Sequence, residues 1–126
     1  CTLQFAQSII AQVTLLLNTL HKSGVLHRDL NQETIGVRTS QSANGGYKVD
    51  KIGAFDCACR LAPGDQVVKT YEQSRWMAPE IRAGERHSFS ADIWSLGQLA
   101  YQLLSVPGKK LRYLHHGKNK PYWLKR

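Results

Sequence analysis

Apolar residues recur at three- and four-residue steps near the start of the chain. They are Ile9, Ile10, Val13, Leu16, Leu17 and Leu20. This spacing is typical of one face of an amphipathic helix, and it predicts a helix from about Leu3 to His21. Gly24 follows, and a glycine in that position commonly ends a helix. The apolar stretch is short and interrupted by polar residues, so no membrane-spanning segment is predicted.

Two short strands joined by a turn are predicted in the middle of the chain. Ile35 to Val37 is expected to form the first strand, and Tyr47 to Ile52 alternates well enough for the strand that returns. Residues 40–46 are rich in turn formers and end in Asn44-Gly45-Gly46, a strong hairpin signal. This region is therefore expected to form a β-hairpin.

The second half of the chain begins with a long loop and ends in another helix. Residues 60–75 contain turn residues but no sustained period, which is typical of a loop. Met77 to Ala83 is expected to form a short helix with Pro79 in its first turn. Ser90 is expected to cap a second amphipathic helix that Pro107-Gly108 ends. The apolar positions of that helix are Ile93, Leu96, Ala100, Leu103 and Leu104.

This order of elements indicates a mainly α fold with a small β-hairpin. The 126 residues suffice for one small domain, and a hydrophobic content of 42% supports a globular core. The chain opens on Cys1 rather than Met, so we expect it to be a piece of a longer protein.

The formal net charge of +8 is unevenly spread along the chain. No Asp or Glu follows Asp92, whereas seven Lys and Arg residues do. Such a run can meet nucleic acid, phospholipid or an acidic peptide, but we favour a solvated surface and predict no specific nucleic-acid binding. Cys1, Cys57 and Cys59 lack the spacing of a metal or redox site, which weakly favours a reducing compartment.

Four short motifs occur in order along the chain. They are His27-Arg28-Asp29-Leu30, Ala54-Phe55-Asp56, Ala78-Pro79-Glu80 and Asp92-Ile93-Trp94-Ser95-Leu96-Gly97. They resemble the H-R-D-L-x-x-x-N, D-F-G, A-P-E and D-x-W-S-x-G motifs of protein kinases. The resemblance covers about residues 3–104 and implies a partial C-terminal lobe of a kinase-like fold, whose parent is α+β with two lobes. Residues 105–126 are then a basic C-terminal segment, and the N-terminal lobe and later helices are expected to lie outside residues 1–126.

The resemblance also implies that several groups needed for phosphoryl transfer have been replaced. Asp29 keeps the position of the Asp that orients the acceptor hydroxyl. Asn31 stands where serine/threonine kinases have a Lys that stabilises the transferring phosphate. Thr34 stands where an Asn holds a metal ion. Ala54 replaces the D-F-G Asp, and its methyl group offers Mg²⁺ no oxygen ligand.

Arg28 has two implied roles. In regulated kinases the corresponding Arg binds a phosphate on the activation segment, for which Thr70, Tyr71 and Ser74 are the candidate acceptors here. The alternative is an arginine that bonds to backbone or acidic groups.

Asp56 leaves three interpretations open. With the register shifted by two residues, Asp56 is the metal ligand and Cys57 replaces the family Phe. In the register that we prefer, Phe55 is that Phe, and Asp56 either reaches a displaced metal ion or is a polar loop residue in place of Gly. We therefore assign no metal site.

The structural half of the kinase pattern is better preserved than its chemical half. The resemblance implies that His27 and Phe55 pack in one apolar column. It implies that Asp92 accepts N–H bonds from the loop that begins at His27, since a buried carboxylate without donors is costly. Glu80 is expected to pair with an Arg that lies beyond residue 126.

These features predict a pseudokinase, a binding or allosteric module with impaired Mg-ATP phosphotransfer. ATP and Mg²⁺ are expected to bind weakly to the full-length parent and not to residues 1–126 alone. The alternatives are an active atypical serine/threonine kinase that uses Asp29, and a non-functional or partial gene product. We expect a protein partner or protein substrate, and the oligomeric state stays open.

A narrower resemblance concerns lineage. Arg60 and Gly64, which follow the altered metal loop, resemble the same region of the secreted rhoptry kinases and pseudokinases of apicomplexan parasites. That resemblance implies a secretory organelle or a host cell as the location, whereas the cytoplasm is the default that the cysteines favour.

Overall fold

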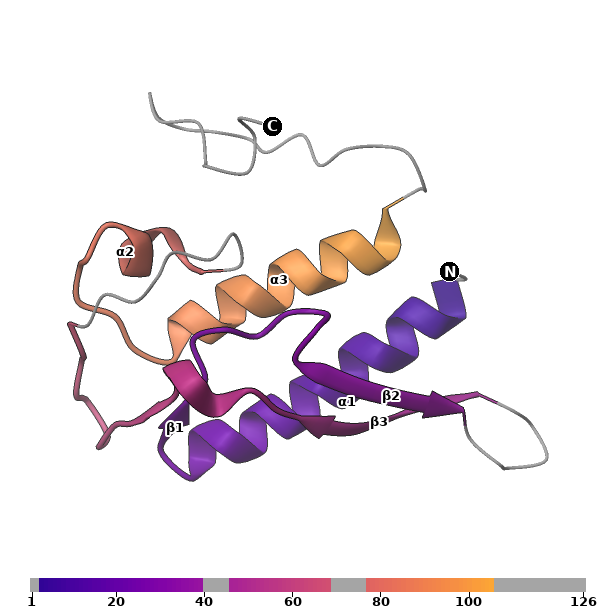
Figure 1. Ribbon diagram of the computed structural model, residues 1–126, viewed down its shortest axis with the longest axis horizontal. Coiled ribbons are helices and arrows are strands. Elements are labelled where there is room, and N and C mark those ends of the chain that lie inside the picture. The colour runs from indigo at the N-terminus through magenta and orange to yellow at the C-terminus, as the bar shows by residue number, and fades with distance from the viewer. Residues whose placement is uncertain (1–2, 40–45, 69–76, 106–126) are drawn as a thin grey trace.

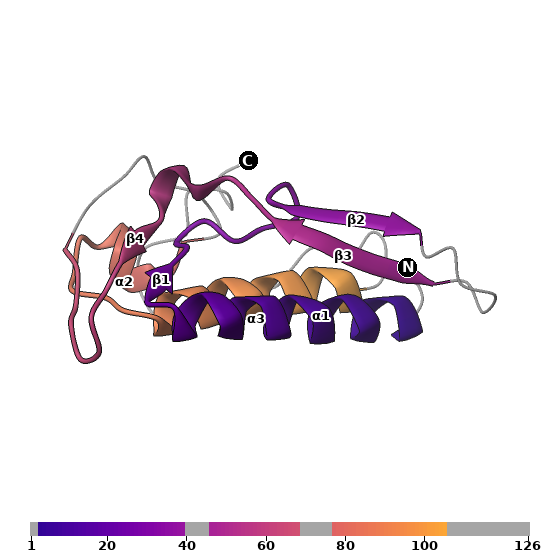
Figure 2. The ribbon, with the colours of Figure 1, turned by 90° about the horizontal axis from the view of Figure 1, so that it is seen from below.

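Two long helices lie side by side, and a β-hairpin lies across one face of the pair (Figure 1, Figure 2). The computed structural model describes residues 3–39, 46–68 and 77–105. The helices are α1 (Leu3–Lys22) and α3 (Ser90–Leu104), and the hairpin strands are β2 (Ile35–Thr39) and β3 (Tyr47–Ile52). The predicted first helix and both predicted hairpin strands are therefore confirmed, and β3 has the predicted bounds.

α1 is the central helix of the core. Its buried residues, Ala6, Ile9, Val13 and Leu17, follow the three- and four-residue spacing that predicted it. Gly24 follows with φ +74, and a Cβ there would lie 2.9 Å from the Leu61 carbonyl oxygen. Both its backbone conformation and its close packing therefore require glycine at this turn.

By length and composition alone α1 would also suffice to cross a membrane, so the expected absence of a membrane-spanning segment stays a prediction. Within residues 3–39, 46–68 and 77–105 it is the one helix that meets both criteria. Its buried face packs against β3 and α3, as the face of a core helix does in a soluble protein.

A side chain from α1 completes the outer edge of β3. The Gln12 amide donates from Nε2 to the Tyr47 carbonyl oxygen at 3.0 Å and accepts from the Val49 N–H at Oε1 at 2.9 Å. These two bonds imitate the pairing of a further strand and protect the edge. Within the hairpin Ile35 pairs with Ile52, and the register shifts between Gly36 and Val37. The turn signal at residues 44–45 lies outside the described residues.

A second two-stranded sheet was not predicted. β1 (Val25–Leu26) pairs antiparallel with β4 (Cys59–Arg60), and the 3-10 helix η1 (Phe55–Cys57) lies between β3 and β4. Strands of two residues show no periodicity, so the hydrophobic pattern could not indicate them. The loop after β4 is held at Val67, which forms a two-way backbone bridge with His87 at 3.0 Å.

The later helices lie where they were predicted, but their bounds, N-cap and buried face differ from the prediction. α2 (Pro79–Arg82) is shorter than expected and has Pro79 in its first turn, as predicted. In α3 the N-cap residue is Phe89 and not Ser90, which is already helical. The predicted apolar face is also partly wrong, because Ile93 and Leu104 are about half exposed. The buried residues of α3 are Ala91, Asp92, Ser95 and Leu99.

The buried face of α3 differs from the predicted face for a physical reason. The side of α3 that faces the loop after β1 carries polar groups, Asp92 and Ser95, which a hydrophobic pattern counts as exposed. The stop signal at residues 107–108 lies outside the described residues.

Two apolar clusters flank the loop that joins β1 to β2, here called the 27–34 loop. The larger cluster contains Ile9, Val13, Leu17, Leu30, Val49 and Leu99. The smaller contains Met77, Ala78, Ile81 and Ala91, with Cys57 packed against it. Leu30 anchors the loop in the larger cluster, so the loop is part of the core.

The described residues are electrically balanced. Eight of the seventeen Lys and Arg residues and eight of the nine Asp and Glu residues fall within them. The net charge of +8 is therefore carried by residues outside the described ranges, mainly by the basic segment at 105–126.

Candidate functional site

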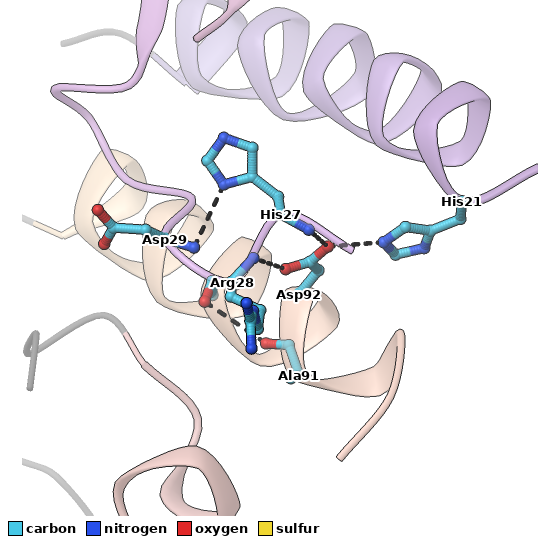
Figure 3. A network of polar contacts seen from close by, with 7 residues as sticks. His21, His27, Arg28, Asp29, Ala91 and Asp92 are labelled. Carbon is cyan, nitrogen blue, oxygen red and sulfur yellow. Dashed lines mark hydrogen bonds and ion pairs between the residues drawn. The ribbon is translucent and has the colours of Figure 1, made fainter. Parts of the chain in front are cut away.

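The start of the 27–34 loop is fixed by Asp92, from the first turn of α3. One carboxylate oxygen, Oδ2, accepts the His27 N–H at 2.8 Å, and the other, Oδ1, accepts the Arg28 N–H at 2.7 Å (Figure 3). Asp92 is 0% exposed, so these donors replace the water that the anion has lost. The hydrogen bonds expected from the sequence are present.

A third donor to Asp92 was not foreseen. His21 Nε2, in the last turn of α1, lies 2.8 Å from Asp92 Oδ2, the same oxygen that accepts from His27 (Figure 3). Its ring packs against Phe89, with ring centroids 4.8 Å apart. Nothing along the chain links residues 21 and 92; only the folded arrangement brings them together.

Arg28 is held in an unusual backbone conformation. Its φ is 68°, in the left-handed region, where a residue with a Cβ is disfavoured by about 1–2 kcal/mol. Its side chain is inside the fold, 1% exposed, and Nε donates to the Cys57 carbonyl oxygen. Arg28 therefore does bond to backbone, as one of its two implied roles required. Its candidate phosphate partners, Thr70, Tyr71 and Ser74, lie outside the described residues.

His27 orients Asp29, which follows Arg28 in the loop. His27 Nε2 lies 2.7 Å from the Gly53 carbonyl oxygen, which can only accept, so Nε2 carries the proton. Nδ1 accepts the Asp29 N–H at 3.2 Å. The ring is thus a neutral bridge between the 27–34 loop and the end of β3.

Asn31 turns back toward the loop instead of outward. It is 4% exposed, and its amide nitrogen lies 2.9 Å from the Asp29 carbonyl oxygen and 3.3 Å from the Asp29 carboxylate. Its amide oxygen accepts the Glu33 N–H at 2.8 Å. Asn31 thus steadies Asp29, but its side chain is short, neutral and already bonded on both sides. It offers no cation to a phosphate.

Thr34 is similarly occupied. It is 7% exposed, and its hydroxyl accepts the Asn31 N–H at 2.9 Å and lies 3.0 Å from the Asn31 carbonyl oxygen. Thr34 therefore closes the 27–34 loop on itself. Its oxygen is bonded to the backbone of the loop.

Ala54 stands exposed between β3 and η1. Its φ of 57° and ψ of 61° place it in the left-handed region, so its backbone is fixed in an unusual geometry although its side chain has nothing to contribute. Phe55 follows, with its ring centroid 5.0 Å from that of His27. The expected ring contact is present, but Phe55 is 45% exposed, so it is not enclosed in an apolar column within the described residues.

Charges of both signs act on the Cys57 thiol. Burial raises the pKa of this thiol, the Asp29 carboxylate raises it further, the Arg28 guanidinium lowers it, and the Asp56 carboxylate adds a smaller increase.

Glu80 lies half-buried in α2, where its carbonyl oxygen accepts the Glu85 N–H at 2.8 Å. Its expected pairing with an arginine stays a prediction.

Comparison with known proteins assigns the chain to a family. Residues 2–122 match the family model of the protein kinase domain. The chain belongs to the protein kinase domain family. The predicted family is therefore confirmed, and the motif residues can be considered as positions of a kinase domain.

Curated protein kinases resemble the chain over most of its length. It is 31% identical to protein kinase C zeta type of Oryctolagus cuniculus and 32% identical to atypical protein kinase C of Drosophila melanogaster, each over 102 residues, or 81% of the chain. It is 36% identical over 108 residues to mitogen-activated protein kinase kinase kinase 4 of Homo sapiens. The chain spans 16% of the length of the first two relatives and 6% of the third.

Kinase domains generally use ATP and Mg²⁺, but the residues of this kinase domain do not fit Mg²⁺ in the usual way. Ala54 has no ligand atom, and the Thr34 hydroxyl is engaged by Asn31. Among residues 3–39, 46–68 and 77–105, no group of three or more His, Cys, Asp or Glu side chains is placed to hold a metal ion. Asp56 is exposed in η1, and it is the one alternative ligand that the sequence offered.

Proposed function

We propose that this kinase domain is a binding or allosteric module with impaired Mg-ATP phosphotransfer, that is, a pseudokinase. The observation that carries the proposal is Ala54, which lacks a ligand atom on a backbone held in the left-handed region. Mg²⁺ requires oxygen ligands in near-ideal octahedral geometry, and a methyl group supplies none. Removing one preorganised charge-stabilising contact commonly costs about 10²–10³ in rate.

The positions of Asn31 and Thr34 support the same proposal. Phosphoryl transfer depends on neutralising the charge of the phosphates. Asn31 brings no charge and is bonded to Asp29 and Glu33, and Thr34 is bonded within the loop. The carboxylates of Asp29 and Asp56 then face an incoming nucleotide with less opposing charge than a kinase with Lys at position 31 would have.

The rival is an active atypical serine/threonine kinase that uses Asp29. One observation favours it, because Asp29 is retained and its backbone and side chain are steadied by His27 and Asn31. The relatives are also named as kinases. A non-functional or partial gene product is the third possibility, and it predicts neither nucleotide nor partner binding.

Nucleotide titrations of the full-length protein separate these alternatives. We expect ATP to raise the melting temperature little, and by the same amount with Mg²⁺ as with EDTA. Asp56→Asn is the matched variant, since it removes the one alternative ligand and should leave this result unchanged. A large Mg²⁺-dependent stabilisation that Asp56→Asn removes would contradict the proposal, because ligand linkage reports binding directly. Phosphorylation of a generic substrate that Asp29→Ala abolishes would establish the rival.

The same proposal includes the lobe assignment. Residues 3–104 are the core of a C-terminal lobe, and residues 105–126 are a basic segment that follows it. Its partner is a protein, bound as ligand or substrate, and the balanced charge of the described residues gives no reason to invoke nucleic acid.

The rhoptry lineage has little support in the fold. Arg60 is the β4 residue that pairs with Val25, and Gly64 has φ +81 in a turn. The positive φ of Gly64 is by itself a structural reason for a glycine there. The lineage, and the secretory location that it implied, stay predictions.

A further inference from the structure

We propose that the outer edge of β2 binds an extended, acidic segment of a partner protein by β-strand addition. The segment pairs with the outward backbone groups of Val37, and its carboxylates meet Lys48 and Lys51. The inference rests on the protein partner in the proposed function and names the kind of segment that this partner presents. It does not depend on whether phosphotransfer is impaired.

The two edges of the hairpin differ in what covers them. β3 lies next to α1, and the Gln12 amide occupies its outer edge through bonds to Tyr47 and Val49. β2 is the other strand of this two-stranded sheet, and in Figure 2 it lies farther from the helices than β3. Among the described residues the hairpin therefore has one covered edge and one open edge, and an open edge is a template for a further strand.

The backbone groups of Val37 point toward the open edge. In an antiparallel pair, two residues that lie opposite each other either exchange both hydrogen bonds or both point away. Val37 lies opposite Val49, whose N–H points away from β2 to Gln12 Oε1. The Tyr47 carbonyl points the same way, so the alternation holds on this side of the register shift. Within residues 3–39, 46–68 and 77–105 nothing bonds to the outward N–H and C=O of Val37.

A lysine from β3 reaches across β2 beside this edge. Gly36 lies opposite Lys51, and a Cβ at Gly36 would be 3.1 Å from Lys51 Cγ and 3.3 Å from Lys51 Cε. The aliphatic stem of Lys51 therefore occupies the space that a side chain at position 36 would fill. Because Cε lies over β2, the ammonium group that follows it is carried toward the open edge.

The charges around the hairpin select the kind of segment. Arg38 pairs with Asp50 at 2.6 Å, and this leaves the exposed Lys48 and Lys51 without a carboxylate among the described residues. Opposite charges on neighbouring strands stabilise their pairing, whereas like charges oppose it. A second copy of β2 and β3 would bring lysines toward lysines, so the surface disfavours self-association and favours an acidic strand.

Fluorescence anisotropy on the full-length protein, without nucleotide, tests the proposal with defined peptides. The probe is a labelled peptide of alternating glutamate and valine. One comparison peptide has lysine in place of glutamate, and another carries a methyl group on every backbone nitrogen. We expect the probe to bind with a Kd at least about tenfold lower than either comparison peptide, because one has the wrong charge and the other has no backbone donor.

Two pairs of variants locate the binding site on the edge. Val37→Pro removes the outward N–H, which the hairpin does not use, and Val37→Ala is the matched control that keeps it. Lys51→Gln removes one cation, and Lys22→Gln is the matched control at the exposed end of α1. We expect Val37→Pro to raise the Kd of the probe about tenfold and Lys51→Gln about threefold, and each control to change it by less than about 1.5-fold.

Several results would overturn the proposal. If the probe does not bind, the edge of β2 is closed in the full-length protein, and this failure is distinct from that of the proposed function because no nucleotide is used. Equal binding of the methylated peptide would show that backbone pairing is not involved, and equal binding of the lysine peptide would show that charge does not select. Displacement of the probe by a short single-stranded oligonucleotide would assign the surface to polyanions in general. If Val37→Pro does not fold, the peptide comparison on the wild-type protein decides.

Discussion

The two sides of the 27–34 loop differ in how their polar groups are used. On the supporting side, Asp92, His27 and His21 form a connected set of hydrogen bonds that joins both long helices to the loop. On the proposed ligand side, the side chains of Asn31 and Thr34 bond to groups of the loop itself, and Ala54 has no polar side chain. The polar groups that support this kinase loop therefore differ from those at the proposed ligand positions in what they bond to.

The two sides differ because losing their polar groups would affect the stability of the folded protein differently. A buried carboxylate must be compensated by donors whatever the protein binds, so losing them would destabilise the fold. The ligand side carries no such obligation. Under the proposed function, an alanine in place of a carboxylate at the exposed position 54 removes a ligand atom without leaving a buried group unsatisfied. The Asn31 side chain is bonded within the loop.

Removing the centre of the supporting side should have the largest effect on stability. Asp92→Ala leaves three donors without their acceptor in the core, and breaking a buried charged network from one side commonly costs about 3–5 kcal/mol. Denaturant unfolding of the full-length protein, followed by a signal of this domain, measures the loss. Asp65→Ala, at an exposed loop position, is the control and should change little. A loss below about 1 kcal/mol would mean that the supporting side is not structural after all.

The element predicted best from the sequence is the one with the longest repeat. α1 was predicted almost to the residue because its apolar positions follow a period of 3.6, whereas β3 was located by the alternation of Tyr47 and Val49 after a turn signal. β1 and β4, with two residues each, carry no repeat and were missed. The face of α3 was misjudged because its buried side includes Asp92 and Ser95.

Only part of the candidate site could be predicted from the sequence. Asp92 and the loop amides were expected from the kinase resemblance, and the substitutions at positions 31, 34 and 54 are visible in the printed sequence. The inward turn of Asn31 and Thr34 depends on the backbone path of the loop, which no local pattern specifies. His21 is 71 residues from Asp92 along the chain, and its role emerges only from the fold.

Placing a metal ligand at position 54 tests the ligand side of the loop. Ala54→Asp returns a carboxylate to a left-handed position, which Asp tolerates better than Ala. We expect ATP with Mg²⁺ to stabilise this variant by about 2.7 kcal/mol at a hundredfold excess over Kd, and ATP with EDTA to have little effect. Thermal-shift titration of the full-length protein measures the difference.

Ala54→Asn is the control for this substitution, because it shares the backbone preference but lacks the charge. Thr34 is best left unchanged, since its hydroxyl closes the loop. If Ala54→Asp gains no Mg²⁺-dependent stabilisation, the ligand side has lost more than one group, and Asn31 and Thr34 become the next positions to restore.

The strand that leads to Ala54 offers a smaller test. Gln12→Ala removes both side-chain bonds to the edge of β3, at Tyr47 and Val49, and should cost about 1–2 kcal/mol. Gln7→Ala, at an exposed position of the same helix, should be neutral. Denaturant unfolding measures both variants. Equal effects would show that these edge bonds contribute nothing to the stability of the domain.

The smallest expected effect concerns the backbone of the ligand side. Ala54 is left-handed, which costs a residue with a Cβ about 1–2 kcal/mol, and glycine escapes this cost but loses about 0.4–1 kcal/mol through the greater freedom of the unfolded chain. Ala54→Gly should therefore stabilise the domain by about 0.5–1 kcal/mol. Ala58→Gly is the matched control, because Ala58 has φ of −68°, where glycine brings no relief and should destabilise. Denaturant midpoints of the full-length variants measure both. A stabilising Ala54→Gly would show that this position keeps a strained backbone without a ligand to use it, whereas a destabilising one would mean that the left-handed turn at Ala54 is not strained.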